Sequence, residues 1–255
     1  MLGEIGIVLV CLIGSFATFF SGFGLGTILL PVFSLYFPLE LAVLATALVH
    51  FSNNLFKLSI MSRHIDLGLL KKFGLTALLG AFLGAYLLRL AGRMGTLFVF
   101  PFWGGREVSL LSFMIGLLML VFVVFEWKKI KFPFSNSTLF LPIGGFLSGF
   151  FGGFSGHQGA LRSAFLSKIS LDKQLFVATS ALISTLIDFS RISIYTNHTN
   201  WAGLNTSYLV LGALSAFIGS ILGKKYLTKV SYGFIQGIVA VFLLAMALGL
   251  MTGLI

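Results

Sequence analysis

The chain has 255 residues, of which 58% are hydrophobic and 9% are charged, and its formal net charge is +10. Because a soluble domain carries about 25% charged residues, this composition excludes a soluble protein and predicts a polytopic membrane protein. Such a net charge would suggest a nucleic-acid partner in a soluble protein, but here the basic residues lie in short loops between apolar segments, where they orient the chain in the lipid bilayer. We therefore expect an integral, multi-pass protein of a prokaryotic inner (cell) membrane that binds no nucleic acid.

Eight apolar segments follow one another along the chain. They run over residues 2–37, 40–60, 67–90, 108–125, 137–167, 175–194, 204–222 and 231–253. Six of them have about 18–24 residues, the length of one helical crossing of a ~30 Å hydrocarbon core. The first and fifth are longer, and glycines interrupt each of them near its middle. This pattern favours re-entrant hairpins, in which two half-helices joined at the break enter and leave on one face.

The distribution of basic residues supports such a hairpin in the fifth segment. If all eight segments crossed the membrane, the Lys and Arg residues of the loops would divide equally between the two faces. With a hairpin, twelve basic residues gather on one face, Lys57 among them, and four remain on the other. These four are Arg89, Arg93, Arg106 and Arg191. The positive-inside rule then places the twelve in the cytoplasm and both termini outside.

The two halves of the chain resemble each other. The matching positions, 133 to 135 residues apart, are Ala45-Thr46 with Ala178-Thr179, Gly26 with Gly159, and Gly80–Gly84 with Ser215–Gly219. The sequence predicts an all-α polytopic membrane protein of two inverted repeats, each a glycine-broken re-entrant helical hairpin plus three transmembrane helices. The repeats span residues 1–125 and 137–255, and residues 126–136 form a cytoplasmic linker. Residues 91–107 have no counterpart in the second half, and we expect an aromatic segment at the outer interface there.

The second glycine break carries polar residues in an otherwise apolar stretch. Six glycines within residues 144–156 precede His157, Gln158 and Arg162. An interior glycine costs a helix about 1 kcal/mol relative to alanine, and broken backbone at membrane depth lines a polar cavity or is buried in protein. Arg162 would lie in the first turn after the break, where free N–H groups favour an anion and the guanidinium adds bidentate donors. The alternative is a structural ion pair with Asp188, although Arg191 is spaced to pair with Asp188 locally.

Further candidate ligands flank both breaks and two helices. The expected substrate site comprises Arg162, His157 and Gln158, the backbone amides around Gly24, Gly26, Gly156 and Gly159, and the polar side chains of His50, Asn53, Asn54, Thr46, Thr179 and Ser184. Hydrogen bonds to free carbonyls of the break or between helices are the competing explanation for these side chains. His157 and Asp188 are the candidates for coupling to a proton.

These motifs resemble those of the TauE/SafE sulfite exporter family, also called the 4-toluene sulfonate uptake permease family. The resemblance rests on Ser21-Gly-Phe-Gly-Leu-Gly-Thr-Ile-Leu-Leu-Pro31, Ala42-Val-Leu-Ala-Thr46, Ile65-Asp66 and Gly80-Ala-Phe-Leu-Gly84, with echoes at Gly156–Gly159, Ala178-Thr179 and Gly219. It implies a secondary transporter, an exporter of a small anion such as sulfite, an organosulfonate or another sulfur oxyanion. The second copy departs from the first by Ala164 in place of Pro31, and by His157, Gln158 and Arg162 in place of apolar or glycine residues.

Other functions stay open beside this one. Discontinuous helices in inverted halves favour alternating access, with one repeat moving against the other, but an anion channel or a transporter of small carboxylates fits the same features. Gly153-Phe-Ser155-Gly156 matches the motif of a rhomboid-like intramembrane hydrolase, whose serine needs a histidine from another span. The histidine of the later part of the chain, His198, falls in an expected outer loop, so this function is a remote alternative. We expect no enzyme, no cofactor and no metal site. Whether the chain forms a homodimer stays open.

Overall fold

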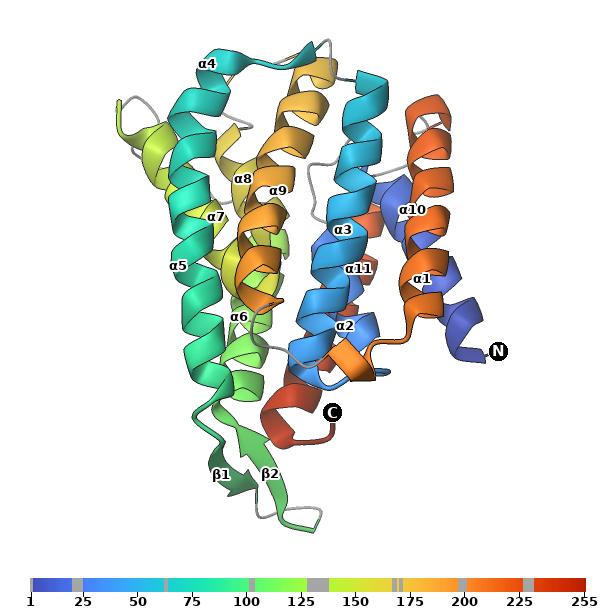
Figure 1. Cartoon of the computed structure of the whole chain (residues 1–255), viewed down its shortest axis with the longest axis vertical. Coiled ribbons are helices and arrows are strands. Elements are labelled where there is room, and N and C mark those ends of the chain that lie inside the picture. Colours follow the sequence, from blue (N-terminus) through green and yellow to red (C-terminus); the bar gives the residue numbers. More distant parts are fainter. Residues whose placement is uncertain are drawn as a thin grey trace.

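The computed structural model describes residues 2–19, 25–61, 64–100, 104–127, 138–166, 169, 172–196, 201–226 and 232–255. Most of these residues are helical (Figure 1). The first half contains α1 (Leu2–Thr18), α2 (Leu25–Ser34), α3 (Leu39–Met61), α4 (Leu67–Leu69), a π-helical turn (Leu70–Gly74), α5 (Leu75–Gly92), β1 (Thr96–Phe100), β2 (Arg106–Ser109) and α6 (Leu110–Trp127). The second half contains α7 (Phe140–Ser155), α8 (Gln158–Leu166), α9 (Lys173–Tyr195), a 3-10 turn (Trp201–Gly203), α10 (Thr206–Tyr226) and α11 (Tyr232–Thr252).

Several of these helices suit a membrane. In the described part of the chain, four continuous helical segments are long and apolar enough to cross a bilayer: Leu39–Met61, Leu67–Gly92, Lys173–Tyr195 and Thr206–Tyr226. Large apolar side chains such as Leu79, Ile218 and Val241 are more than half exposed on the outside of the bundle. Exposed aliphatic surface on so many helices is what contact with lipid requires. Apart from one small hairpin, the regular elements of the described residues are helices, as in an all-α membrane protein.

That hairpin is a departure from the sequence expectation. Strands β1 and β2 pair antiparallel, with Phe98 opposite Val108 and Phe100 opposite Arg106. Residues 96–100, Thr-Leu-Phe-Val-Phe, are rich in β-branched and aromatic side chains, which favour a strand. Gly104 and Gly105 both have positive φ, which glycine tolerates in a tight turn. In place of the predicted aromatic segment, Thr96–Phe100 and Arg106–Ser109 therefore form a β-hairpin, which projects from the end of the molecule where both termini lie (Figure 1). Phe102 and Trp103 lie outside the described residues.

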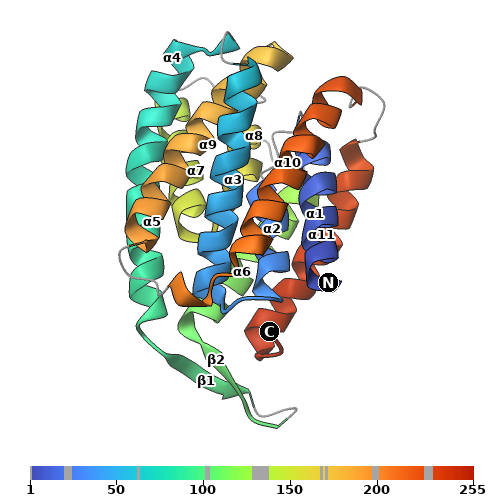
Figure 2. The same ribbon diagram turned by 45° about the vertical axis from the view of Figure 1, so that its right-hand side comes forward.

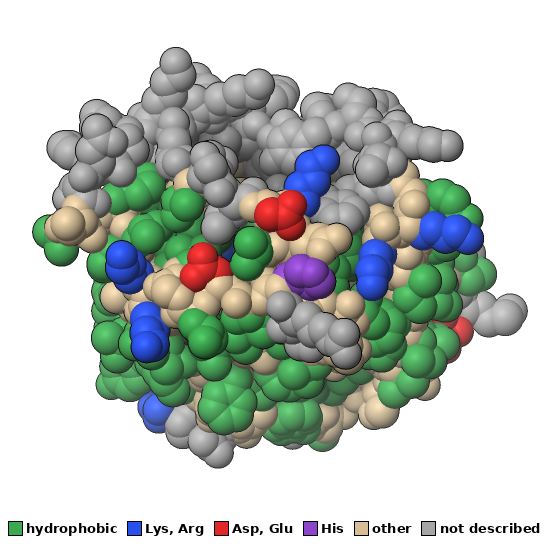
Figure 3. Space-filling model, turned by 90° about the horizontal axis from the view of Figure 1, so that it is seen from above, with side chains coloured by type: hydrophobic (Ala, Val, Ile, Leu, Met, Phe, Trp, Pro, Cys, Tyr) green, Lys and Arg blue, Asp and Glu red, His purple; other side chains and the backbone are tan. Residues whose placement is uncertain are grey.

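The two ends of the molecule differ in charge. The end that carries α4 also carries the lysines of the π-helical turn, the start of α9 and the end of α10, namely Lys71, Lys72, Lys173, Lys224 and Lys225. Figure 3 looks down on this end and shows basic side chains spread across it, above sides that are mostly hydrophobic. At the opposite end, Arg89 and Arg93 close α5 and Arg106 begins β2. This asymmetry is in line with the predicted orientation of the chain.

Glycine faces hold the closest helix pairs together. Helix α5 packs along α7, and α1 packs along α10, as both Figure 1 and Figure 2 show. A Cβ on Gly80 or Gly84 would collide with the backbone of α7 at Phe146 or Phe150, and one on Gly219 would collide with the backbone of Leu12. The backbones approach this closely only because these residues have no side chain. The matching positions Gly80–Gly84 and Gly219 of the two halves are thus sites of close helix packing.

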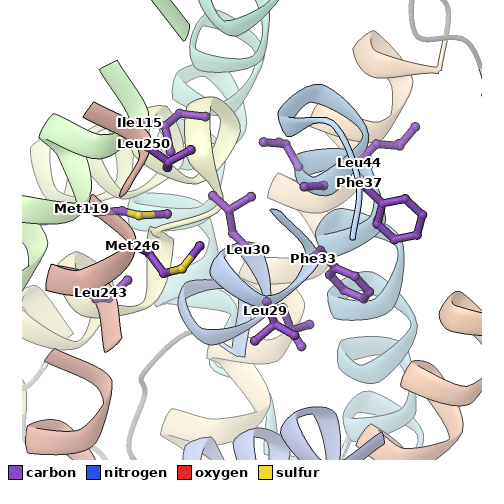
Figure 4. Packing of buried hydrophobic residues seen from close by; sticks show 14 of the residues in the cluster. Leu29, Leu30, Phe33, Phe37, Leu44, Ile115, Met119, Leu243, Met246 and Leu250 are labelled. Atoms are coloured by element: carbon purple, nitrogen blue, oxygen red, sulfur yellow. The ribbon is translucent and has the colours of Figure 1, made fainter. Parts of the chain in front are cut away.

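The apolar core fixes the short helix α2 in the centre of the bundle. Leu29 and Leu30 are fully buried, and Figure 4 shows the side chains of α2 between those of α3 on one side and those of α6 and α11 on the other. Met119 of α6 and Met246 of α11 contribute to this cluster. Burying a Leu or Phe side chain contributes about 1.5–3 kcal/mol. A helix too short to cross a membrane is thereby anchored by its sides.

Candidate functional site

The two glycine breaks meet inside the bundle. A Cβ placed on Gly26, in the first turn of α2, would lie 3.0 Å from the carbonyl oxygen of Gly156. Gly156 ends α7 with φ of +82°, and its N–H donates to the carbonyl of Gly152 at 2.9 Å. The left-handed conformation lets the chain reverse within one residue and begin α8. Gly159 is buried in the first turn of α8, whereas Gly24 lies outside the described residues.

Asp188 is the centre of a buried polar cluster beside this crossing. Its side chain is fully buried in α9 and its two oxygens accept hydrogen bonds from three helices. Those donors are His50 Nδ1 at 2.6 Å, Arg191 Nε at 3.0 Å, Gln158 Nε2 at 3.2 Å and Asn54 Nδ2 at 3.3 Å. Arg191 also forms an ion pair with Asp188, with its Nη2 2.8 Å from Oδ1. The carboxylate therefore joins α3 of the first half to α8 and α9 of the second. The expected local pair between Asp188 and Arg191 is confirmed.

Arg162 lies next to this cluster without a carboxylate bonded to it. Its Nη1 donates to the hydroxyl of Ser184 and, at 3.1 Å, to Oε1 of Gln158. The side chain is 4% exposed, and its Nε has no hydrogen-bond partner among the described residues. A buried guanidinium that meets only neutral oxygens has unused capacity for an anion. The alternative of an Arg162–Asp188 ion pair is not what the structure forms, because Arg191 occupies that carboxylate.

A pocket opens beside Arg162. It encloses about 330 Å³ of empty space, part of it open to solvent, and it is lined by Thr18, Phe19, Leu25, His50, Asn54, Lys57, Arg162, Phe176, Val177, Ser180, Ala181 and Ser184. Lys57 lies near the end of α3, and Phe176 and Val177 lie in the first turns of α9. Both of these helix ends belong to the lysine-rich end of the molecule (Figure 1). The pocket is thus a polar, basic cavity in the half of the bundle toward that end.

The comparison with protein families agrees with this architecture. The model of the family described as "Sulfite exporter TauE/SafE" matches residues 7–250, nearly the whole chain. The chain belongs to the TauE/SafE family. Members of this family are membrane transporters of sulfur anions such as sulfite, so this TauE/SafE protein is an integral multi-pass membrane protein of a transporter family and not of an enzyme family. Comparison with curated proteins gave no match.

The structure of this TauE/SafE protein brings together part of the expected site. His50, Asn54, Arg162 and Ser184 line the pocket. Gln158 and Asp188 do not line it, but they form hydrogen bonds with Arg162, His50 and Asn54 and with each other. These six residues come from one helix of the first half and two of the second. They form the candidate site.

Other expected ligands lie elsewhere in the TauE/SafE protein. Asn53 accepts hydrogen bonds from Ser15 and Ser220 at the contact of α3 with α1 and α10. Thr179 accepts from the backbone N–H of Asp66, and Thr46 is buried with no partner for its hydroxyl among the described residues. None of these side chains lines the pocket. Asn53 and Thr179 fit the alternative of hydrogen bonding between segments better than ligand binding.

His157 is also separate from the pocket. Its Nδ1 lies 2.9 Å from Ser155 Oγ, and its ring stacks on Phe122 with centroids 5.1 Å apart. The imidazole is fully buried. The ring therefore packs between the α7–α8 turn and Phe122 of α6.

The structure corrects the predicted positions of two basic residues that the sequence placed in loops at the membrane faces. Arg191 was assigned to the outer face, but it is fully buried against Asp188. Lys57 was assigned to the cytoplasm, but it is 7% exposed, lines the pocket and places its Nζ 5.4 Å from the centroid of the Phe19 ring. Sequence spacing could have placed Lys57 correctly, because positions 50, 54 and 57 lie on one helix face. His50 and Asn54 therefore point to Lys57 as a third member of the site in this TauE/SafE protein.

Proposed function

We propose that the chain is a secondary transporter that binds a small anion in the pocket beside Arg162 and exports sulfite or a related sulfur oxyanion from the cell. The observation that carries this proposal is the buried guanidinium of Arg162, which bonds only neutral oxygens and faces a cavity in the membrane-embedded bundle. A buried cation without a bonded counter-ion is costly in a membrane. An anion bound against it removes that cost, and Ser184, Asn54 and His50 add donors around the anion.

The arrangement of the hairpins supports alternating access. Helix α1 starts at the end of the molecule where both termini lie and is followed by α2, while α7 starts at the opposite end and is followed by α8 (Figures 1 and 2). This favours two inverted repeats, residues 1–125 and 137–255, joined by residues 126–136, most of which lie outside the described residues. Broken helices that meet near the midplane are typical of secondary transporters.

The pocket lies between two groups of helices. On one side, α1, α2 and α3 contribute Thr18, Leu25, His50, Asn54 and Lys57; on the other, α8 and α9 contribute Arg162, Phe176, Ser180 and Ser184. Relative movement of these groups would close the pocket toward one face and open it toward the other. Since the pocket lies toward the lysine-rich end, which the positive-inside rule places in the cytoplasm, this conformation is the one in which an exporter loads its substrate.

For coupling to a proton, the geometry favours a different histidine from the one that the sequence suggested. His50 lines the pocket and contacts Asp188 at 2.6 Å, whereas His157 lies behind the hairpin turn. We propose the His50–Asp188 pair as the coupling site. A proton held by this pair would change the charge beside the anion directly.

The test is anion binding and flux in purified and reconstituted protein. Sulfite, thiosulfate and sulfoacetate should raise the thermal stability of the wild type, and Arg162→Ala should abolish that effect and the flux. Lys72→Ala is the matched control, because it removes an exposed positive charge from the same end without touching the pocket. An Arg162→Ala protein that is folded and binds every anion as the wild type does would move the site away from the second hairpin. Stabilisation by small carboxylates alone would change the substrate class.

A further inference from the structure

We infer that the pocket takes a doubly charged oxyanion, with Lys57 as the second cationic ligand beside Arg162. This inference rests on the proposed function, because it concerns the same pocket. It goes beyond that function in separating sulfite, sulfate-like and thiosulfate-like dianions from the singly charged sulfonates and carboxylates.

Lys57 is held in the pocket without a counter-ion. Its side chain is 7% exposed and lines the cavity opposite α8 and α9. Within the described residues it forms no salt bridge, and its closest favourable partner is the ring of Phe19. A cation–π contact contributes about 0.5–2 kcal/mol, far less than the cost of removing an ammonium from water. The ammonium thus has all of its strong donor capacity free for a ligand.

The charges around the pocket do not balance. With Lys57 protonated, Arg162, Arg191 and Lys57 supply three positive charges, and Asp188 supplies one negative charge that Arg191 pairs directly. Lys57 and Arg162 line the same pocket, so their positive charges repel each other. Asp188 also attracts Arg162, but its oxygens are already filled by four donors. The surplus is two positive charges, and His50 adds a third whenever it is protonated.

Among the described residues, no acidic side chain lines the pocket. The whole chain has seven acidic residues, and Asp188 is the only one among them in the interior of a long helix. Asp66 and Asp172 cap helix starts at the lysine-rich end, where they bond the backbone N–H groups of Leu69 and Gln174. The others are Glu4, Glu40, Glu107 and Glu126, at or near the ends of helices and in the hairpin. A dianionic ligand would balance the two charges of Arg162 and Lys57 in the pocket.

The neutral lining fits the same ligand. The hydroxyl of Ser180 is buried in the pocket wall and has no hydrogen-bond partner among the described residues. The Nε of Arg162 is free in the same way. A compact anion with three or more oxygens can accept from the guanidinium, the ammonium and a hydroxyl at once. A monovalent sulfonate offers similar oxygens but leaves one positive charge uncompensated.

The experiment compares two anions that differ by one charge and little in size. Sulfate and methanesulfonate, with thiosulfate as a second dianion, are titrated at constant ionic strength against the wild type, Lys57→Gln, Lys57→Arg and the control Lys72→Gln. We expect the wild type and Lys72→Gln to bind the dianions about tenfold or more tightly than methanesulfonate. Lys57→Gln should lose about tenfold or more in dianion affinity and little in methanesulfonate affinity, and Lys57→Arg should keep the preference.

Each outcome separates this inference from the proposed function. Equal affinity of the wild type for sulfate and methanesulfonate, or an equal loss of both in Lys57→Gln, would overturn the dianion assignment while leaving the Arg162 site in place. Binding of no anion by the wild type would refute the proposed function itself. If Lys57→Gln does not fold, the dianion preference of the wild type and its retention in Lys57→Arg decide the question.

Discussion

Replacing Asp188 by Asn should destabilise the protein more than any other single change of charge. The substitution keeps the shape of the side chain but removes the only negative charge next to Arg191, which is fully buried. Breaking a buried ion pair by removing one partner costs about 3–5 kcal/mol, because the remaining charge is uncompensated. The new amide also directs a donor at His50 or Gln158, which donate to that position now. For a chain of this size, such a loss lowers the melting temperature by on the order of 10 °C.

The assay is thermal unfolding in detergent, followed by the loss of the monodisperse peak in size-exclusion chromatography. Asp172→Asn is the matched control, since Asp172 is an exposed N-cap and asparagine caps a helix equally well. Adding Arg191→Met to Asp188→Asn should restore part of the stability, because the uncompensated charge is gone. A melting temperature of Asp188→Asn within about 2 °C of the wild type would refute the reasoning. So would a double variant whose losses simply add.

Two further predictions concern glycines. Gly149→Ala places a methyl group into the backbone of α5 at Ala77. It should cost about 1–3 kcal/mol of stability, measured as a lower melting temperature. Gly237→Ala is the control and should be neutral or slightly stabilising, because a Cβ at Gly237 meets nothing within 4 Å. Equal effects of the two would show that α5 and α7 are less closely packed than described. Gly156→Ala should cost about 1–2 kcal/mol for the left-handed conformation alone. Because its Cβ would lie 2.9 Å from Arg191 Nη1, it should also weaken anion binding, and unchanged binding would dissociate the hairpin turn from the site.

The sequence was sufficient for those parts of the structure that depend on local pattern. Helix lengths, the two glycine breaks and the close approach at Gly80 and Gly84 follow from spacing along one segment. The Asp188–Arg191 pair lies within one turn of one helix, so its spacing alone predicts it. Arg162 was singled out because an arginine among glycines and phenylalanines has no role on a lipid-facing surface.

What the sequence did not show depends on contacts between distant segments. His50 and Asp188 are 138 positions apart, and only the packing of α3 on α9 brings them together. Neighbouring positions on a helix point about 100° apart, so Asn53 and Asn54 cannot both face the pocket, and the sequence does not say which one does. The sequence predicts that Lys57 faces the cytoplasm, because a lysine near the end of an apolar segment marks the membrane boundary in most membrane proteins. In the structure, Lys57 lines the pocket instead.

The glycine contact between α5 and α7 also constrains how the protein is made. Helix α5 leaves the ribosome well before α7, and its glycine face at Gly80 and Gly84 has no side chains with which to fill the space that α7 will occupy. Helix α1 likewise leaves the ribosome long before α10, whose Gly219 packs against the backbone of α1 at Leu12. We therefore expect that neither half matures as an independent unit during insertion into the membrane, and that assembly takes place late, once both halves are present.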